Sequence, residues 1–327
     1  MNRRIPGSPL VVQNSGLPRN FLWDAASLAL NPRVQFRKVS LIGVGLLGGS
    51  LGLALRARRL ASEVHGYVRR AEIAPSAVAA GVVDHATSNL GAAVAGADLV
   101  VLCTPIGQMA SLVGSLAPHL ARGTLVTDVG SVKGMVVGQL EPLVEAAGGW
   151  FVGSHPMAGS ERTGFESARE DLFDRAICVI TPTERTHGPA RERIEALWTA
   201  VGAQVLRLSP SQHDELVSRS SHLPHVVAAG LANYVLSPAH VRTQALLCAS
   251  GFRDTTRIAG SSPEMWRDIA LANREHLGRS LGVLVADLQE FQRALDEQDA
   301  DAIEDFFSKA RTRRSDWLSG VRTPDAE

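Results

Sequence analysis

The sequence predicts two domains, an α/β domain built on a parallel sheet and then an all-helical domain, and three observations support this prediction. Between Lys38 and Leu208, short apolar runs alternate with segments of helix length, as is typical of parallel strands covered by helices on both faces. After Leu208 nearly every segment has a helical pattern. The chain of 327 residues also exceeds the usual size of a single domain.

The strands of the first domain are predicted from short runs rich in Val, Ile and Leu. "KVSLIG" (38–43) predicts the first strand, and "LLGGSLGLALRARR" (46–59) predicts the helix that follows it. The remaining strand candidates are, in chain order, 63–68, 97–105, 123–130, 150–156, 175–182 and 203–209. Because helix-length segments separate these runs, we expect strand–helix–strand units and a sheet of parallel strands.

The second domain is predicted to begin near Ser209. In "SPSQ", Ser209 can cap a helix, a proline occupies the first helical turn, and Gln212 follows three residues after the serine, which together mark a helix start. "SSPE" (261–264) repeats this pattern. The predicted divisions are an N-terminal extension at 1–37, the α/β domain at 38–208, the helical domain at 209–318 and a tail at 319–327. We expect the extension to be disordered or loosely docked.

The composition argues against several classes of partner. Lys and Arg number 33 and so do Asp and Glu, so no overall charge attracts nucleic acid or an anionic membrane surface. No window approaches the ~18 apolar residues of a membrane span, and the N-terminus lacks the pattern of a secretory signal. Cys103, Cys178 and Cys248 are scattered in apolar runs, which indicates neither a disulfide framework nor a metal site. We therefore expect a cytoplasmic protein without a nucleic-acid or membrane partner.

One helical segment of the second domain has a regular apolar seam. Spacings of four and three residues alternate along Leu277, Leu281, Leu284, Leu288, Phe291 and Leu295, a heptad pattern over nearly three repeats. The pattern is compatible with a core helix inside one subunit and with a seam between two subunits. Because a helical domain of this size has a limited core of its own, we favour a homodimer formed through it.

A glycine-rich segment follows the first predicted strand. "LIGVGLLGGSLG" contains Gly43, Gly45 and Gly48 in the spacing G-x-G-x-x-G, between an apolar strand and a helical run. In a Rossmann-type domain the first glycine permits a tight turn, the second lets the backbone approach a pyrophosphate, and the third lets helix and strand pack closely. We therefore expect an NAD(P)+ site rather than a glycine turn without a ligand. The expected cofactor contacts also include Leu46, Leu47, Thr104 and Pro105.

The choice between the two dinucleotides depends on the end of the second predicted strand. NAD-binding domains usually have an acid there, which accepts hydrogen bonds from the ribose hydroxyls. In "HGYVRR" this place is taken by Val68, and Arg69 and Arg70 follow. An arginine could pair with a 2′-phosphate, so we place NADP+ slightly ahead of NAD+; the alternative is that both arginines are only a solvated helix start.

Four further stretches follow the glycine loop. They are "DVGSVKG" (128–134), "GSHPMAGSE" (153–161), "HDELVSRSSHLPH" (213–225) and "GFRDTTRIAGSSPEMWRD" (251–268). Together with the glycine loop, these blocks resemble the prephenate and arogenate dehydrogenases of tyrosine biosynthesis. The resemblance extends from about Val39 to about Leu295, and five blocks in this order make it specific.

The resemblance implies a Rossmann domain, a helical dimerisation domain and an active site in the cleft between them. It also implies a reaction, in which a cyclohexadienol loses hydride from C4 to the nicotinamide, loses its ring carboxylate as carbon dioxide and becomes a phenol. Prephenate would give 4-hydroxyphenylpyruvate, and arogenate would give tyrosine. Of these and 4-amino-4-deoxyprephenate, we expect prephenate to be the substrate.

This chemistry needs an acceptor for the hydrogen of the C4 hydroxyl. A neutral imidazole, with an unperturbed pKa of about 6.5, suits that role at cytoplasmic pH. His155 matches the family's catalytic histidine, so we predict that it is the acceptor and base; the alternative is a strand-end histidine bonded to the backbone. Ser131 matches the serine that bonds this histidine and helps to place the nicotinamide, and it could also cap the following helix.

The substrate carries carboxylates, so cationic and hydroxyl side chains are expected to meet it. Arg257 matches the family's carboxylate-binding arginine, whose planar guanidinium can hold a carboxylate at two points. Ser160 stands where threonine is frequent in the family, and either hydroxyl can donate to a carboxylate. Asp254 could hold Arg257 or a histidine, or it could be an ordinary acid at a helix end.

His213, His222 and His225 occur together in one block. The reaction needs no Lewis acid, and no cysteine or carboxylate accompanies them at ligand spacing, so we predict no metal site. Pro224 is expected to bend the helix here, so helical spacing does not show which of the three histidines share a face. By the resemblance, His225 approaches the substrate side chain, while His213 and His222 organise the site, and we include His222 among the substrate-binding candidates. Trp266 is expected to pack in a core or an interface. The resemblance implies that it reaches the cleft of a neighbouring subunit.

Two other functions share part of the pattern. A β-hydroxyacid dehydrogenase also has a glycine loop and a helical second domain, but its chemistry needs a lysine in that domain, and none occurs between Ser209 and Arg279. A dinucleotide-sensing regulator without turnover would not need His155, Ser131 and Arg257 together. The sequence therefore favours an oxidoreductase.

Overall fold

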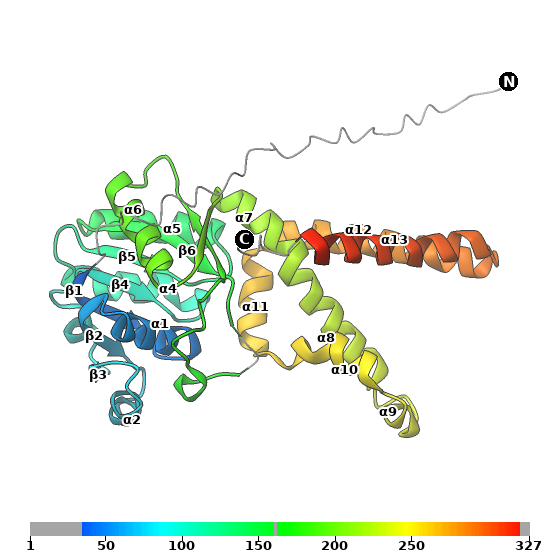
Figure 1. The fold of residues 1–327 in the computed structure, drawn as a ribbon, viewed down its shortest axis with the longest axis horizontal. Coiled ribbons are helices and arrows are strands. Elements are labelled where there is room, and N and C mark those ends of the chain that lie inside the picture. Colours follow the sequence, from blue (N-terminus) through cyan, green and yellow to red (C-terminus); the bar gives the residue numbers. More distant parts are fainter. Residues whose placement is uncertain (1–34, 160–161, 321–327) are drawn as a thin grey trace, which may run out of the picture. The chain divides into compact units, whose positions relative to one another are not determined.

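The computed structural model describes residues 35–159 and 162–320, and an eight-stranded sheet forms the centre of the first domain. The strand order is β3-β2-β1-β4-β5-β6-β7-β8, and Figure 1 labels β1 to β6 of this sheet. The strands are β1 (Phe36–Ile42), β2 (Ala61–Tyr67), β3 (His85–Thr87), β4 (Leu99–Leu102), β5 (Leu125–Asp128), β6 (Trp150–Pro156), β7 (Ile177–Thr181) and β8 (Gln204–Arg207). Every strand predicted from the sequence is present. β3 is an additional strand, and its three residues are too few to leave a periodic pattern.

The sheet differs from the predicted all-parallel arrangement at one edge. All neighbouring pairs from β3 to β6 are parallel, but β7 pairs antiparallel with β6, and β8 then runs parallel to β7. Between β6 and β7 the described part of the chain forms only the short 3₁₀ helix η4 (Phe165–Ser167). Because a parallel return needs a long crossover, usually a helix, the chain re-enters the sheet from the same end and runs antiparallel.

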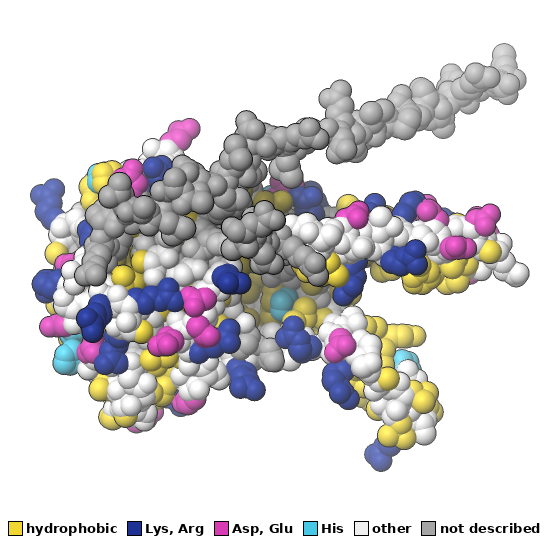
Figure 2. Space-filling view, in the orientation of Figure 1, with side chains coloured by type: hydrophobic (Ala, Val, Ile, Leu, Met, Phe, Trp, Pro, Cys, Tyr) yellow, Lys and Arg dark blue, Asp and Glu magenta, His cyan; other side chains and the backbone are white. Residues whose placement is uncertain are grey.

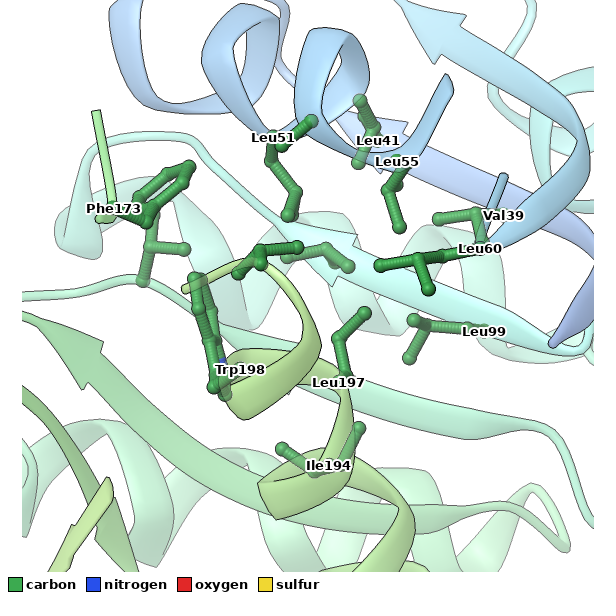
Figure 3. Close-up of a cluster of buried hydrophobic side chains, with 14 of the residues drawn as sticks. Val39, Leu41, Leu51, Leu55, Leu60, Leu99, Phe173, Ile194, Leu197 and Trp198 are labelled. Atoms are coloured by element: carbon green, nitrogen blue, oxygen red, sulfur yellow. The ribbon is translucent and has the colours of Figure 1, made fainter. Parts of the chain in front are cut away.

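Helices cover both faces of the sheet in two apolar layers. The helices are α1 (Leu46–Ala57), α2 (Ala74–Ala79), α3 (Leu90–Val94), α4 (Ile106–Leu116), α5 (Gly134–Ala146) and α6 (Gly188–Ala200). Residues of α1 and α6, among them Trp198, form one buried cluster (Figure 3), and residues of α3, α4 and α5 form the other. Along β4, Leu99 and Val101 belong to the first cluster while Val100 and Leu102 belong to the second, so the strand alternates between two buried faces.

The second domain contains only helices among its described residues. They are α7 (Pro210–Val217), the π-helical segment η5 (Ser218–His222), α8 (Leu223–Val235), α9 (Thr243–Leu246), α10 (Ser250–Thr256), the 3₁₀ helix η6 (Arg257–Gly260), α11 (Pro263–Ala272), α12 (Arg274–Asp296) and α13 (Ala300–Gly320). Ser209 and Gln212 form the predicted capping box at the start of α7, and Ser262 caps α11. An α/β Rossmann-type domain followed by a helical domain is therefore confirmed.

The predicted terminal segments are only partly covered by the structure. β1 already begins at Phe36, inside the range 1–37 expected to be an extension, and residues 1–34 lie outside the described residues. At the other end α13 continues to Gly320, into the range predicted as a tail, and the described chain stops there. In the described part of the chain, no helix has both the length and the apolar character needed to cross a membrane.

Helix α12 carries all the residues of the predicted apolar seam. Leu277 is buried, and the Phe291 ring lies 4.6 Å from the Phe306 ring of α13, measured between centroids. Leu288 and Leu295, however, are 50% and 51% exposed, and Figure 2 shows apolar side chains along the surface of these two helices. One chain therefore leaves much of the seam uncovered, as is typical of a surface that contacts another protein.

Candidate active site

The candidate cofactor site lies at the carboxyl ends of β1 and β4. The glycine loop follows β1, and Thr104 and Pro105 follow β4, which is hydrogen-bonded to β1. From β1 the sheet continues to β2 on one side and to β4 on the other. This reversal of strand order is the place where open α/β sheets bind their ligands.

The three glycines of the loop have different steric surroundings. Gly43 has a φ of +104°, which favours glycine. A Cβ on Gly48 would lie 2.1 Å from the carbonyl oxygen of Gly43, so only glycine allows α1 to pack this closely on the strand. A Cβ on Gly45 would have no atom within 4 Å. The open side of the loop is therefore at Gly45, where a pyrophosphate is expected to approach.

The groups around the loop fit a dinucleotide. The N-terminus of α1, which begins with Leu46 and Leu47, has no acid in its first turn and no side-chain cap from Gly45, so its N–H groups are available to an anion. The Oγ1 atom of Thr104 is buried and has no hydrogen-bond partner among the described residues. Pro105 caps α4. A buried hydroxyl without a partner beside an open glycine loop fits a polar ligand.

The end of β2 agrees with the sequence in having no acid. Val68 is buried and its N–H donates to the carbonyl of Thr87. Arg70 lies 3.8 Å from the carboxylate of Glu72, whereas Arg69 is exposed and has no ion pair with any described residue. Both arginines are therefore exposed at this position, and Arg69 is the one without an ion pair among the described residues.

His155 lies near the end of β6 and is bonded to the second domain. Its Nδ1 atom is 2.8 Å from Nε2 of His213, and Nδ1 of His213 is 2.8 Å from Oδ1 of Asp214. Asp214 also accepts the backbone N–H groups of Lys133 and Gly134, each at 2.7 Å, at the start of α5. His213 and Asp214 belong to α7. The imidazole of His155 is therefore oriented by a carboxylate that joins α5 to α7.

Burial determines the charge of these groups. It lowers the pKa of His155 well below 6.5, and the charges of His213 and Lys133 lower it further. Burial also lowers the pKa of His213, although the bond to Asp214 opposes this. For Asp214, burial raises the pKa, but the hydrogen bonds from His213 and from the two backbone N–H groups outweigh it and the pKa is lowered. The three groups are thus a carboxylate and two neutral imidazoles.

The second ring nitrogen of His155 is unbonded. His155 is 8% exposed, and its Nε2 atom has no hydrogen-bond partner in residues 35–159 and 162–320. This nitrogen is therefore left for a hydrogen bond with a ligand.

A second buried network holds the backbone next to His155. Lys133, which is 0% exposed, forms an ion pair with Asp128, and its ammonium donates to the carbonyl of Ser154 at 2.7 Å. Asp128 also accepts the N–H groups of Gly130 and Ser154. Burial lowers the pKa of Lys133, and the neighbouring Asp128 raises it. This network fixes the end of β5 against β6, directly before the catalytic candidate.

Ser131 lies in the loop between β5 and α5, as the sequence predicts, but it is not the hydrogen-bond partner of His155. Among the residues that the structure describes, the His155 ring is bonded to His213 and not to Ser131. The backbone of Ser131 is close enough to His222 to raise the pKa of that histidine. The serine therefore lies at the site without the predicted bond.

His222 is positioned by a break in helix geometry. Pro224 lacks an N–H group and cannot fit against a regular α-helical turn, and the chain forms the π-helical segment η5 directly before it. The amide nitrogen of Asn273 donates to the backbone carbonyl of Asp214 at 2.8 Å and lies 3.1 Å from Nδ1 of His222. Since that nitrogen is a donor, Nδ1 of His222 accepts and its Nε2 carries the proton. Burial lowers the pKa of His222 from 6.5 to about 4.

His225 and Trp266 are stacked, and the charge of Arg257 acts on His225. The rings of His225 and Trp266 stack with centroids 3.8 Å apart, and Nδ1 of His225 donates to the carbonyl of Ser221 at 2.9 Å. Burial lowers the pKa of His225; the Ser221 bond opposes this, and the charge of Arg257 adds to it. Trp266 thus packs against a histidine of its own chain. The group offers an aromatic wall beside a cation.

Two predicted residues are not brought into this group. Asp254 is exposed on α10 and, among the described residues, makes no ion pair with Arg257 and no bond to a histidine. Ser160 lies outside the described residues. Where side chains are described, no three His, Cys, Asp or Glu residues are grouped as metal ligands.

Several residues of the site have no role predicted from the sequence, among them Lys133, Asp214 and Asn273. Lys133 and Asp214 stand within the blocks that resemble the family. An acid directly after His213 could have indicated a carboxylate bonded to that histidine, but only once the fold is known. Asn273 stands between two helices with no local pattern. All three act through contacts between segments distant in sequence.

Two family models match the chain. Residues 51–207 match the model described as "Prephenate dehydrogenase, nucleotide-binding domain", and residues 209–309 match "Prephenate dehydrogenase, dimerization domain". A prephenate dehydrogenase of Bacillus subtilis is 34% identical over 282 residues, which cover 84% of this chain and 75% of that protein. A cyclohexadienyl dehydrogenase of Zymomonas mobilis is 32% identical over 281 residues, covering 85% of this chain and 95% of that protein.

A solved structure is also similar. It is a prephenate dehydrogenase from A. aeolicus in complex with hydroxyphenyl propionate and NAD+, with a TM-score of 0.79 and 30% sequence identity. The match covers 88% of this chain and 99% of the other.

Alanine substitutions at Gly45 and Gly48 test the placement of the pyrophosphate at the glycine loop. Gly45→Ala places a methyl group in open space, so we expect an unchanged melting temperature and weaker binding of the dinucleotide, by about tenfold or more, a loss of about 1.4 kcal/mol. Gly48→Ala forces a Cβ against the Gly43 carbonyl and should lower the melting temperature itself. Fluorescence titration with reduced dinucleotide and thermal melts measure both. A Gly45→Ala protein that binds the dinucleotide as tightly as wild type would contradict the placement of the pyrophosphate.

The buried ion pair generates a prediction about stability. Lys133→Met leaves the Asp128 carboxylate buried without its cation, which should reduce the free energy of unfolding by about 3–5 kcal/mol. Lys309→Met is the matched control, because Lys309 is 62% exposed and pairs with Asp305 one helical turn away; its effect should stay within about 0.5 kcal/mol. Denaturant unfolding measures both, and equal effects would refute the structural role of Lys133.

Proposed function

The chain belongs to the prephenate dehydrogenase family, and from this premise we propose that it converts prephenate to 4-hydroxyphenylpyruvate with NAD(P)+ as the oxidant, in the biosynthesis of tyrosine. The observation that carries the proposal is the state of His155. It is a buried, neutral imidazole with Nδ1 engaged by His213 and Nε2 open to a ligand. An oxidoreductase that removes hydride from a carbinol carbon needs an acceptor of this kind at the hydroxyl.

The balance of the reaction limits what the acceptor does. The dinucleotide supplies the hydride acceptor, so prephenate and NAD(P)+ become 4-hydroxyphenylpyruvate, carbon dioxide and NAD(P)H, and no proton is released. The C4 hydrogen leaves as hydride, the electron pair of the broken bond to the ring carboxylate enters the ring, and the hydroxyl hydrogen remains on the product. His155 therefore accepts a hydrogen bond, or takes the proton and returns it to the same oxygen. A weakly basic imidazole suits this role, since it polarises the O–H bond without retaining the proton.

The carboxylates of the substrate are assigned to the other side of the site. The charge of Arg257 acts on His225, whose ring stacks on Trp266, and we assign these three to the substrate. Nε2 of His222 carries a proton but is buried and has no hydrogen-bond partner among the described residues, so the substrate role of His222 stays a prediction from the resemblance. Ser160 and Asp254 stay predictions from the resemblance, with less support from the described contacts.

The cofactor is a nicotinamide dinucleotide, and we propose a preference for NADP+. Support comes from the absence of a carboxylate at Val68 and from Arg69, which is exposed and unpaired among the described residues, next to an Arg70 that is paired with Glu72. Thr104 and Ser131 are assigned to the nicotinamide half, and the open side of the loop at Gly45 is assigned to the pyrophosphate.

The helical domain is assigned to homodimer formation, because α12 exposes much of its apolar seam. We also propose a cytoplasmic location, which fits three cysteines that are all free thiols.

The proposed function predicts the reaction itself. Purified protein with prephenate should reduce the dinucleotide, measured by the absorbance of NAD(P)H, with a higher kcat/KM for NADP+ than for NAD+. Arg69→Ala should remove that preference, and Arg70→Ala should keep it. Turnover only with arogenate or with 4-amino-4-deoxyprephenate would replace the proposed substrate, and an unchanged preference in Arg69→Ala would remove the role given to Arg69.

A further prediction concerns the binding of the substrate carboxylate by Arg257. The departing carboxylate loses its charge, so an ion pair to it favours the ground state over the transition state. Arg257→Ala should raise KM for prephenate by roughly 10- to 100-fold, the worth of a hydrogen bond to a charged group, and lower kcat much less. Arg122→Ala, at the opposite end of β5, is the matched control and should change neither constant. A fall in kcat with KM intact would contradict the assignment.

A further inference from the structure

We propose that His213 and Asp214 are positioning residues that hold the proton of His155 on Nδ1, and that this makes Nε2 the hydrogen-bond acceptor of the reaction. The inference rests on the proposed function in one respect, that His155 is the group facing the substrate hydroxyl. Neither residue need touch the substrate.

The direction of the hydrogen bonds starts at Asp214. Its Oδ1 and Oδ2 atoms accept the N–H groups of Lys133 and Gly134, both at 2.7 Å. A backbone N–H can only donate, so both oxygens act as acceptors, and a carboxylate at the N-terminus of α5 is also favoured by the helix dipole. The third bond at Oδ1, with Nδ1 of His213 at 2.8 Å, must therefore have the histidine as donor.

The donor at Nδ1 of His213 determines the proton positions on His213 and then on His155. A neutral imidazole carries one proton, so a His213 that donates from Nδ1 has a lone pair on Nε2. That lone pair lies 2.8 Å from Nδ1 of His155, which must then carry a proton and donate. The proton of a neutral His155 is thereby placed on Nδ1, and Nε2 is left with its lone pair.

The opposite arrangement is costly because the site is closed. His213 is 0% exposed and Asp214 is 4% exposed. A proton on Nε2 of His213 would set the Nδ1 lone pair against the carboxylate at 2.8 Å, and in a buried site neither group can exchange this repulsive contact for bulk solvent. The observed distances admit only one low-energy pattern of protons.

This pattern connects the two domains of the chain. His155 belongs to β6 of the Rossmann-type domain, whereas His213 and Asp214 belong to α7 of the helical domain. The backbone of Asp214 is held in turn by Asn273 at the start of α12. The acceptor on one domain is therefore prepared by residues of the other, and correct packing of α7 against α5 is a condition for it.

The chain of bonds positions a proton and does not export one. The reaction releases no proton, so nothing has to travel from His155 through His213 to solvent. The expected effect of losing the chain is a mixture of His155 tautomers, in which the fraction with a proton on Nε2 meets the substrate hydroxyl with a donor instead of an acceptor.

The test compares two replacements of His213 in the full-length protein. His213→Leu removes the acceptor for Nδ1 of His155, while Asp214 keeps its two backbone donors, so the protein should fold. His213→Gln offers a carbonyl oxygen to His155 and an N–H to Asp214. We expect His213→Leu to lower kcat with prephenate on the order of 100-fold, the lower part of the range for a general base, with KM for prephenate and the dinucleotide unchanged. His213→Gln should recover most of this loss.

Three further variants complete the experiment. In Asp214→Asn the amide can donate to His213, which reverses the chain of bonds, so kcat should fall at least as far as in His213→Leu. His119→Gln is an exposed histidine on the 3₁₀ helix η3 (Ala117–His119) and should behave as wild type. His155→Asn should be nearly inactive. Thermal melts of all variants show whether kcat follows stability, as a merely structural role would require.

The outcomes separate this inference from the proposed function. Wild-type kcat in His213→Leu, or equal losses in His213→Leu and His213→Gln at equal stability, overturns the positioning role alone, provided His155→Asn is inactive. An active His155→Asn variant overturns the role of His155 itself and the inference with it. Loss in His213→Leu, recovery in His213→Gln and unchanged KM support the inference.

Discussion

The carboxylate of Asp214 at the N-terminus of α5 is the interaction on which the rest of the active site depends. It accepts two backbone N–H groups of one domain and belongs to a helix of the other, so it joins α5 to α7 through bonds that are buried and charge-assisted. The same carboxylate determines which nitrogen of His213 carries a proton and, through it, the state of His155. The packing of α7 against α5 therefore also determines which nitrogen of His155 carries a proton.

Burial gives the histidines of the site defined roles. It lowers the pKa of His155, His213, His222 and His225 alike, so each is a neutral ring with one donor and one acceptor. Fixed partners then decide which nitrogen is which: His155 is left with an acceptor, and His222 with a donor. Positive charge comes from Arg257, where a carboxylate is expected, and from Lys133, which is neutralised by Asp128 behind the strand. A substrate with several carboxylates and one reacting hydroxyl fits this division.

Much of the fold follows from local patterns, and the parts that do not are those set by distant contacts. All strands of the sheet except β3, the glycine loop, the capping box at Ser209 and the N-cap at Ser262 are visible in short windows of sequence because periodicity and turn chemistry are local. The direction of β7 is not, since strand sense depends on how the chain returns to the sheet. His155 and Arg257 match motifs of the family, and their roles stay predictions. The bond from His155 to His213 spans 58 positions, and the bond from Lys133 to Asp214 spans 81. No local pattern of sequence therefore identifies the partner of His155, and the predicted bond to Ser131 is not formed.

Neutron diffraction from a deuterium-exchanged crystal of the protein with bound dinucleotide tests the central claim most directly, because it locates the hydrogen on the imidazole of His155. The account predicts nuclear density for deuterium on Nδ1, directed at Nε2 of His213, and none on Nε2 of His155. Density on Nε2 of His155, with Nδ1 bare, would contradict it.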